Sequence, residues 1–408
     1  MTYLMRYWKS ILIILLAVYA LPVAYYILFG TLGSHGATDF HQFWYAGQFI
    51  LMGQDPYQAY FSGVSLPMRQ PGLESGHSNT PLLQLVLSTL SIFPWSVAKI
   101  VWLVLNLLLV ALSFWLVVDK LPFPLVSLDR QTKVLIFLLF FDLSPTRIAI
   151  ENGQTTLLVF VLMLAAVLLA KRSWGWSGFL LGLALSKYSV SLPVVLFLLY
   201  HRNFRVLVTA LLTQFFGFVG LSILSGTPIL LVFGEYIQLF ISLIDQPGIH
   251  LANLVPGTRY DLLPSAVMSI VLAALLYLWL FRWKPSSHVD ERVLDFHLLT
   301  ILALWSLLVA YHRLYDAVVI ILLIVLVFKS FQRADVWNLT LQMRAVVAWG
   351  LGIGLALLTI AARIVDALLP GMYDPLTNDI PAVVLLVFLS ALMALLYRFL
   401  YPPVFEVR

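Results

Sequence analysis

The sequence predicts an all-α polytopic membrane protein, and three observations predict it. Of the 408 residues, 62% are hydrophobic and only 11% are charged, whereas soluble domains carry about 25% charged residues. The mean hydropathy is +0.97. Apolar runs recur from Ile11 to Leu400, and in a bilayer such runs form helices because their backbone polar groups must pair internally. We expect a single integral membrane domain over residues 1–408.

The same composition excludes several classes of protein. Cysteine is absent, so there is no disulfide framework, thiolate nucleophile or Cys-type zinc site. His35, His41 and His77 share one loop but lack metal-ligand spacing, and no nucleotide-binding loop motif occurs, so no metal site is predicted. The net charge of +5 suits basic inner loops and gives no reason to expect nucleic acid as a partner. The first apolar run is too long for a signal peptide, which favours a retained first helix.

Spanning helices are expected where an apolar run approaches the roughly 20 residues that a crossing needs. They are predicted near 11–30, 97–118, 133–150, 155–171, 205–225, 261–283, 294–310, 315–329, 345–369 and 380–400. Residues 81–94 are too short and are expected to dip into the outer interface. Residues 174–200, interrupted by Ser186, Lys187 and Tyr188, are expected to form a hairpin of two short helices. These assignments give about twelve crossings, with both termini in the cytoplasm.

Positive charge supports this scheme, because basic residues concentrate in cytoplasmic loops. The scheme places most of the 24 lysines and arginines inside, and it makes 31–96 and 226–260 the outer loops. In the opposite arrangement 81–94 crosses and 174–200 crosses once. That arrangement moves the basic residues of 120–172 outside and puts Lys187 in the middle of the bilayer.

The polar residues that the scheme leaves outside suggest a shared cavity on the outer face. Ionisable groups near a membrane are costly to keep, so they mark function by default. The candidate site residues are Asp39, His41, Gln42, Trp44, Tyr45, Asn152, Gln154, Lys187, Tyr188, Asn253, His312 and Arg313.

Each candidate has a structural alternative. Asp39 could act as a general base or cap the helix expected after it. Its aromatic neighbours, Phe40, Phe43, Trp44 and Tyr45, could line a sugar site or form an interfacial belt. Asp55, between Gly53 and Pro56, reads as part of a structural turn.

The cations are weighed in the same way. Lys187, isolated between apolar runs, could hold a phosphate or extend its ammonium to the lipid headgroups. Arg313 could also bind phosphate, with Asp316 as its partner. The alternative is that His312, Arg313 and Asp316 form a self-satisfied interfacial loop.

Three segments carry a family resemblance: DFHQFWYAGQFILMGQDPY in the first outer loop, NGQTTLLVFVLMLAAVLLA, and WSGFLLGLALSKYSVSLPVVLFLLYHRNFR. Together they resemble the polyprenol-phosphate-mannose-dependent α-1,2-mannosyltransferases of glycosyltransferase family 87, which have the GT-C fold. The resemblance covers most of residues 1–210 and fades afterwards. The chain departs from the family pattern at Tyr188, where a proline is usual after the lysine.

The resemblance implies a GT-C-type bundle of about twelve transmembrane helices, with short interfacial helices in the first outer loop. It implies an enzyme that transfers a mannose-like hexose from a polyprenyl-phosphate donor to a hydroxyl of a glycolipid or glycan acceptor. Asp39 would be the general base, and Lys187 and Arg313 would contact the donor phosphate. The reaction would invert the anomeric centre without metal or cofactor, among the lipids of a bacterial inner membrane and on its outer face.

Three alternatives stay open at this stage. A lipid-linked saccharide flippase or polymerase would carry polar groups through the bilayer, whereas here they gather on one side. A secondary transporter would show broken helices and a repeat relating its halves, and the sequence shows no convincing repeat. A non-catalytic protein that kept the fold is the third.

Overall fold

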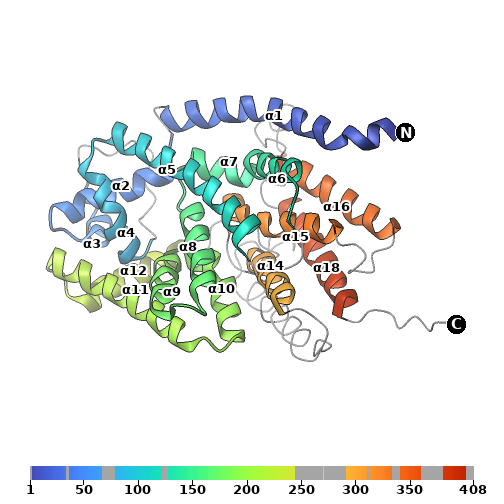
Figure 1. Cartoon of the computed structure of the whole chain (residues 1–408). Helices are drawn as coiled ribbons and strands as arrows, with labels where there is room; N and C mark the ends of the chain where they lie inside the picture. The colour runs from blue at the N-terminus through green and yellow to red at the C-terminus, as the bar shows by residue number, and fades with distance from the viewer. Residues whose placement is uncertain are drawn as a thin grey trace, which may run out of the picture. The chain divides into compact units, whose positions relative to one another are not determined.

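The computed structural model describes residues 2–33, 36–66, 79–121, 127–243, 270, 291–309, 312–332, 341–359 and 380–400. Within these ranges the chain is helical and contains no strand (Figure 1), which confirms the predicted all-α class. The chain divides into two compact units. Unit 1 comprises Met1–Ala20, Val117–Pro145 and Pro247–Arg408, and unit 2 comprises Leu21–Leu116 and Thr146–Gln246.

The long first helix, α1 (Thr2–Leu32), begins in unit 1 and ends in unit 2. The other helices of unit 2 are α2 (Thr38–Leu51), α3 (Pro56–Phe61), α4 (Pro81–Leu87), η1 (Ser88–Ile92), α5 (Trp95–Trp115), α7 (Ser144–Glu151), α8 (Thr156–Leu169), α9 (Trp174–Ala184), η3 (Leu185–Lys187), α10 (Tyr188–Tyr200), α11 (Phe204–Ser225) and α12 (Ile229–Leu243). Unit 1 holds η2 (Leu116–Lys120), α6 (Arg130–Asp142), α14 (Glu291–Val309), η5 (Leu314–Ile320), α15 (Ile321–Gln332), α16 (Leu341–Thr359) and α18 (Ile380–Leu400).

Several helices are long and apolar enough to cross a membrane, so the chain is an integral membrane protein. Among the described residues these are Tyr7–Leu32, Trp95–Lys120, Trp174–Tyr200, Phe204–Ser225 and Leu314–Gln332, with α7 and α8 forming one more if their bent pair is counted as a single span. The predicted total of twelve crossings stays a prediction. The predicted span 261–283 lies outside the described residues.

One predicted span is wrong. Residues 133–150 form two helices, because α6 ends at Asp142 and α7 begins at Ser144. Leu143 between them is extended, with φ −59° and ψ 135°. Pro145 supplies the reason: its nitrogen has no hydrogen to donate and its ring would clash with the preceding turn of a continuing helix.

The predicted hairpin over 174–200 is supported by the path of the chain. By length and composition this segment qualifies as one span, but Lys187 leaves the helical conformation with φ −123° and ψ 74°. A straight helix would separate Gly178 from Tyr200 by about 33 Å. A β-carbon on Gly178 would nevertheless lie 2.8 Å from the carbonyl oxygen of Val206, and six residues after Tyr200 extend only about 20 Å. The chain therefore doubles back at Lys187.

Small residues set the packing around this hairpin. A β-carbon on Gly178 would come within 2.4 Å of Thr209, and one on Gly182 within 2.5 Å of Thr213. The glycine and the threonine are the same distance apart in sequence in both pairs, so α9 and α11 run parallel. They approach closely because small residues four apart leave room between membrane helices. The hydroxyl of Ser177 donates to the carbonyl of Ala166 on α8 at 2.7 Å.

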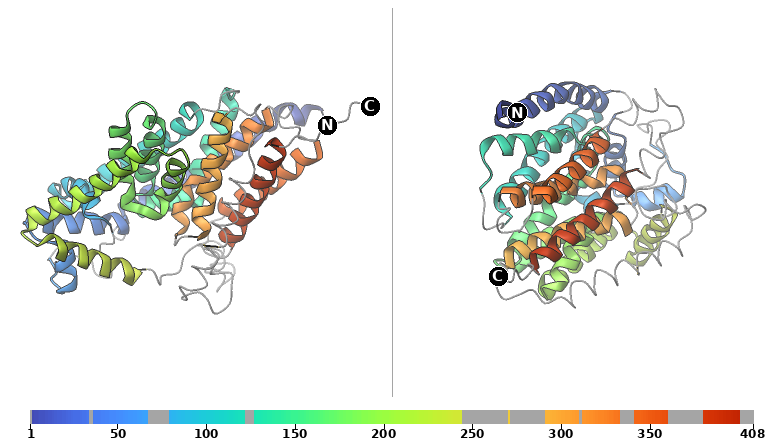
Figure 2. Two further views of the ribbon diagram at one scale, coloured as in Figure 1. Left: turned by 90° about the horizontal axis from the view of Figure 1, so that it is seen from below. Right: turned by 90° about the vertical axis from the view of Figure 1, so that its right-hand side faces the viewer.

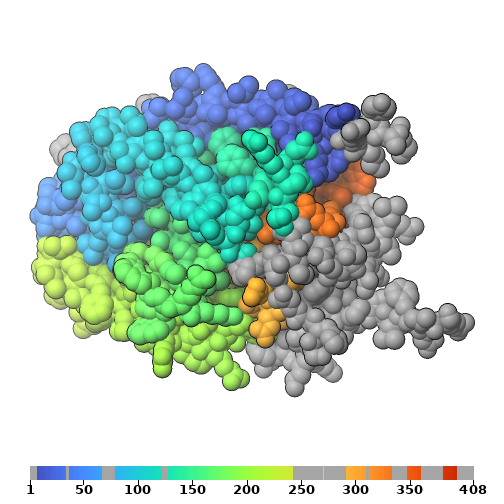
Figure 3. All heavy atoms as spheres, in the orientation of Figure 1, coloured from blue at the N-terminus to red at the C-terminus, as the bar shows by residue number. Residues whose placement is uncertain are grey.

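The described residues of the predicted first outer loop, 36–66 and 79–96, form helices that pack inside unit 2. Residues 81–92 form α4 and η1, which are too short to span a membrane and which contact α2 and α11. At the other end of the loop, α3 contacts α12 (Figure 3), where Tyr57 and Tyr236 meet with ring centroids 6.0 Å apart. These described segments are therefore a packed part of the fold.

Unit 1 is built around buried apolar helices. Helix α14 packs against α18, and α16 packs against the same helix (Figure 2). Helix α15 is buried along most of its length. Among the described residues of unit 1, Lys9 pairs with Asp129 at 2.8 Å and Lys133 pairs with Asp119 at 2.5 Å.

Candidate functional site

A broken helix forms the centre of the candidate site. Helices α7 and α8 meet at an angle of 113°, and the turn between them carries Asn152, Gly153 and Gln154. Gly153 has φ +68°, and a β-carbon there would lie 2.6 Å from Cβ of Phe40. Glycine fits this position because it has no β-carbon to clash with Phe40 and because it adopts a positive φ readily, as other residues rarely do. The indole nitrogen of Trp102 donates to the carbonyl oxygen of Gly153 at 2.8 Å.

This turn anchors the start of α2. The carbonyl oxygen of Asn152 accepts the backbone N–H groups of Asp39 at 3.0 Å and of Phe40 at 3.3 Å. The carbonyl of Glu151 accepts the N–H of Ala37 at 3.1 Å. Ala37 is the N-cap of α2 and makes no side-chain cap, so the neighbouring turn satisfies N–H groups that a helix start leaves without helical partners.

Asp39 therefore does not cap its own helix, and that alternative is wrong. The residue lies inside the first turn of α2, where the positive end of the helix dipole favours a carboxylate. Its side chain is half-buried. The capping role belongs to the backbone of the 152–154 turn, which leaves the Asp39 carboxylate available for side-chain interactions.

Gln154 connects Asp39 to Lys187. Its amide nitrogen Nε2 donates to Oδ2 of Asp39, and its Oε1 accepts from Nζ of Lys187 at 3.2 Å. The same ammonium donates to Oγ1 of Thr156 at 2.6 Å. We call Asp39, Gln154, Lys187 and Thr156 the polar relay.

The relay brings together residues that are far apart in sequence. Asp39 comes from α2, Gln154 from the turn before α8, Thr156 from the first position of α8, and Lys187 from the hairpin tip. Gln154 is 7% exposed, and the two charged ends are half-buried. The Lys187 ammonium is thus held by protein acceptors instead of reaching toward headgroups. The predicted candidates Asn152 and Gln42 are half-buried, and Tyr188 is 44% exposed.

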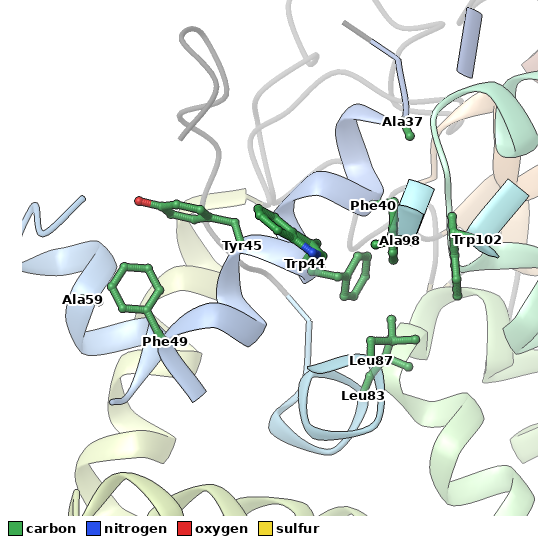
Figure 4. Packing of buried hydrophobic residues seen from close by; sticks show 11 residues of the cluster. Ala37, Phe40, Trp44, Tyr45, Phe49, Ala59, Leu83, Leu87, Ala98 and Trp102 are labelled. Carbon is green, nitrogen blue, oxygen red and sulfur yellow. The ribbon is translucent and has the colours of Figure 1, made fainter. Parts of the chain in front are cut away.

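The aromatic residues of the first loop do not form an interfacial belt, and that interpretation is wrong. Phe40, Phe43, Trp44 and Tyr45 are at most 8% exposed, because this face of α2 packs against α4, η1 and α5 (Figure 4). Phe40 stacks between Trp95 and Trp102, with centroids 5.7 and 4.8 Å away.

His41, Trp44 and Tyr45 are buried, and a role for them in binding substrate stays a prediction. His41 is 2% exposed and meets the edge of Trp95 at 4.9 Å. The indole of Trp44 donates to the carbonyl of Phe93 at 3.0 Å, and the hydroxyl of Tyr45 accepts from the N–H of Leu66 at 2.6 Å. The structure places all three in the core that supports Asp39.

Asp55 is structural, as predicted. It is the N-cap of α3 and accepts the N–H of Tyr57 at 2.8 Å. Gly53, with φ +70°, follows the end of α2, and Pro56 opens α3. Burial raises the pKa of the Asp55 carboxyl above its usual value.

The late candidates lie in unit 1. His312 is fully buried, and its Nδ1 lies 3.2 Å from Oδ2 of Asp316. The same oxygen accepts the backbone N–H of Arg313 at 3.2 Å, while the Arg313 side chain is exposed. A role for Arg313 or His312 in binding stays a prediction. Asn253 lies outside the described residues.

The sequence of the chain matches a known protein family. The profile of glycosyltransferase family 87 matches residues 78–328, more than half of the chain. The chain belongs to glycosyltransferase family 87. This membership confirms the resemblance and makes the protein a membrane glycosyltransferase. No curated protein and no solved structure matches the chain significantly.

The residues of this family 87 enzyme that match the profile include only part of the polar relay. Gln154, Thr156 and Lys187 fall within residues 78–328, whereas Asp39 precedes them. Sequence reasoning missed Gly153, Thr156 and Trp102. Gly153 was visible as a glycine between two apolar runs, but the partners of Thr156 and Trp102 appear only in three dimensions.

The arrangement suits group transfer by this family 87 enzyme. The side-chain amide of Gln154 bridges a carboxylate and an ammonium, because it donates to Asp39 and accepts from Lys187. Separated charges of this kind can serve the two ends of a displacement, one accepting a proton and the other stabilising a leaving anion.

Proposed function

We propose that the enzyme transfers a mannose-like hexose from a polyprenyl-phosphate donor to a hydroxyl of a glycolipid or glycan acceptor. The observation that carries this proposal is the polar relay, in which Gln154 joins Asp39 to Lys187. Family membership supplies glycosyl transfer as the reaction class. A membrane enzyme with half-buried charges at helix ends is suited to a substrate that is lipid at one end and sugar at the other.

In this proposal Asp39 is the general base. Its carboxylate accepts the proton of the acceptor hydroxyl, and the resulting oxygen attacks the anomeric carbon. The bond from that carbon to the donor phosphate breaks, and its electron pair leaves with the phosphate toward Lys187. A single displacement of this kind inverts the anomeric configuration.

The other relay members position these two groups. Gln154 donates to Asp39 and accepts from Lys187, so it fixes the direction of both side chains. Thr156 provides a second acceptor for the ammonium. A monophosphate leaving group needs little more than a cation to stabilise it, so we propose that transfer is independent of metal ions, and activity that survives a chelator would support this.

A transfer assay tests the proposal. Membranes containing the wild type are supplied with radiolabelled polyprenyl-phosphate hexoses and compared with Asp39→Asn. We expect transfer to fall by about 10²- to 10⁴-fold, the usual contribution of a general base. Asp129→Asn removes a carboxylate from another loop and should retain activity. Equal transfer by wild type and Asp39→Asn would remove the carboxylate from the mechanism.

We also propose the setting: a bacterial inner membrane, the relay on its outer face, and both termini in the cytoplasm. Because the chain has no cysteine, single cysteines report topology cleanly. Tyr188→Cys, beside Lys187, should react with an impermeant thiol reagent added outside intact cells. Arg172→Cys, at the opposite end of α9, should react only after the membrane is opened. The reverse pattern would invert the orientation.

A further inference from the structure

The end of unit 2 opposite the relay carries a dense group of cations. Helix α8 runs antiparallel to α9, and α9 runs parallel to α11, so the 170–173 and 201–205 loops lie at the same end of these helices. The offset that pairs Gly178 with Thr209 places Trp174 level with Arg205. Lys171, Arg172, Arg202 and Arg205 are all exposed at this end. We call these four residues the basic end.

Nothing in the local sequence neutralises the basic end. No aspartate or glutamate occurs between Glu151 and Glu235, so the three helices that form it bring no acidic side chain. Like charges gathered on one surface repel one another. An anionic partner would relieve that repulsion.

A pocket lies within this end of the unit. It has a volume of about 600 Å³ and is lined by Arg172, Ser173, Trp174, Gly175, Trp176 and Phe179. The aromatic members are exposed, Trp174 by 53% and Trp176 by 65%. The rings of Trp176 and Phe179 meet edge to face at 5.9 Å. A cation beside exposed aromatic rings offers one region for a phosphate and another for hydrocarbon.

Arg202 provides a separate indication. Its φ is +56°, a left-handed conformation that costs a residue with a side chain roughly 1–2 kcal/mol. The position follows α10 and closes it through N–H bonds from Arg202 to Leu199 at 3.0 Å and from Asn203 to Leu198 at 2.9 Å. Glycine is the usual residue at such a helix end. Strained backbone of this kind points to a function for the side chain.

We infer that the basic end binds the headgroup of an anionic phospholipid, with its phosphate at Arg172 and its acyl chains along Trp176 and Phe179. The membrane is the source of this ligand because the pocket places Arg172 beside exposed aromatic side chains on an apolar helix. Basic residues near a membrane surface each add about a factor of five to the affinity for anionic lipid. The site is separate from the relay and independent of the sugar that the enzyme transfers.

Native mass spectrometry of the detergent-solubilised full chain tests this inference. Phosphatidylglycerol is titrated, and the dissociation constant of the first bound lipid is measured. Phosphatidylcholine serves as a lipid that also carries phosphate but has no net charge. We expect phosphatidylglycerol to bind at least about tenfold more tightly, and Arg172→Gln to weaken it about fivefold. Equal affinity of the two lipids would overturn the inference.

Matched variants separate binding from other effects of charge. Arg130→Gln removes an exposed arginine from the start of α6 and should leave lipid binding unchanged. Arg202→Gly should weaken binding about fivefold while raising the thermal unfolding temperature, because glycine adopts a positive φ without strain. An equal loss in Arg130→Gln would show a nonspecific effect of net charge and would overturn the site.

A competition arm distinguishes a lipid site from a small-anion site. Inorganic phosphate is added to the lipid-bound protein and compared with chloride at equal ionic strength. We expect both salts to displace the lipid to the same extent. Selective displacement by millimolar phosphate would contradict the lipid assignment and identify a site for free phosphate.

Discussion

The indole nitrogen of Trp102 donates a hydrogen bond of 2.8 Å to the carbonyl oxygen of Gly153. The ring of Trp102 also stacks on Phe40, with an interplanar angle of 5°, so one buried side chain touches both the turn and the start of α2. Trp102 is fully buried. The geometry of the relay therefore depends on apolar packing as well as on polar contacts.

Gly153→Ala should destabilise the enzyme and reduce transfer. The substitution places a β-carbon 2.6 Å from Phe40 at a φ of +68°, so it combines steric overlap with backbone strain. Gly226→Ala is the matched control, since Gly226 has a φ of +69° with no neighbouring atom within 4 Å. Thermal unfolding in detergent should show a larger loss for Gly153→Ala. Equal losses would mean that backbone strain alone is responsible.

Gln154→Leu should reduce transfer while leaving the protein folded. Leucine has a similar size but cannot orient Asp39 or Lys187, and misplacement by about 1 Å is enough for a 10²-fold loss. Gln154→Glu tests the positioning role through pH. It keeps an acceptor for Lys187 but adds a second carboxylate beside Asp39, so the acid limb of the pH–rate profile should move to higher pH. An unchanged profile would show that Gln154 does not act on the base.

Lys187→Gln should lower kcat/KM for the lipid-phosphate donor by about 10²- to 10³-fold, because a preorganised cation at a leaving group contributes on this scale. Lys187→Arg keeps the charge and should recover part of the loss. Steady-state kinetics with varied donor concentration would separate binding from turnover. If the glutamine and arginine variants are equally impaired, packing at the hairpin tip matters more than charge.

Asp129 should contribute a small, pH-dependent stability. Hydrogen bonds from Lys9 and from Thr132 lower the pKa of its carboxyl below the usual 3.8. Stability from a lowered pKa is present above the unfolded value and is lost as pH falls through the folded value. The Asp129 side chain is 48% exposed, so solvent limits the contribution to about 1 kcal/mol.

The measurement for Asp129 compares thermal unfolding of wild type and Asp129→Asn at pH 7 and at pH 3. The difference between the two proteins should shrink at the lower pH and in high salt. A difference that stays constant would show that the charge of Asp129 is not its source. Asparagine and aspartate are comparable N-caps, so the substitution should leave the cap of α6 intact.

Hydropathy and charge were sufficient to predict the class, many of the helices and the hairpin at Lys187, because length and apolar composition act locally. They failed at 133–150, where Pro145 divides an apolar run that hydropathy alone treats as continuous. For the site, polarity in an apolar chain singled out Asp39, Gln154 and Lys187, which the structure brings together, while their roles stay a prediction. Their hydrogen bonds could not be read from the sequence, because Asp39, Gln154 and Lys187 come from three separate segments of the chain.

The aromatic residues of the first loop show the opposite failure. Trp44 and Tyr45 have the composition of a membrane-interface belt, but composition does not say whether a ring faces lipid or protein. Helices α4 and η1 decide that question by covering this face of α2. Trp44 and Tyr45 are therefore core residues, although their composition is typical of a membrane-interface belt.

The interruption between α7 and α8 also determines what the backbone can do there. In one uninterrupted helix the carbonyl of Asn152 would bond to the N–H four residues ahead, at Thr156. Because the helix stops, that oxygen is released to receive Asp39 and Phe40. The break between α7 and α8 therefore supplies the acceptor for the N–H groups at the start of α2. Any change that straightened residues 144–169 would remove these hydrogen bonds to the first loop, even with every relay side chain intact.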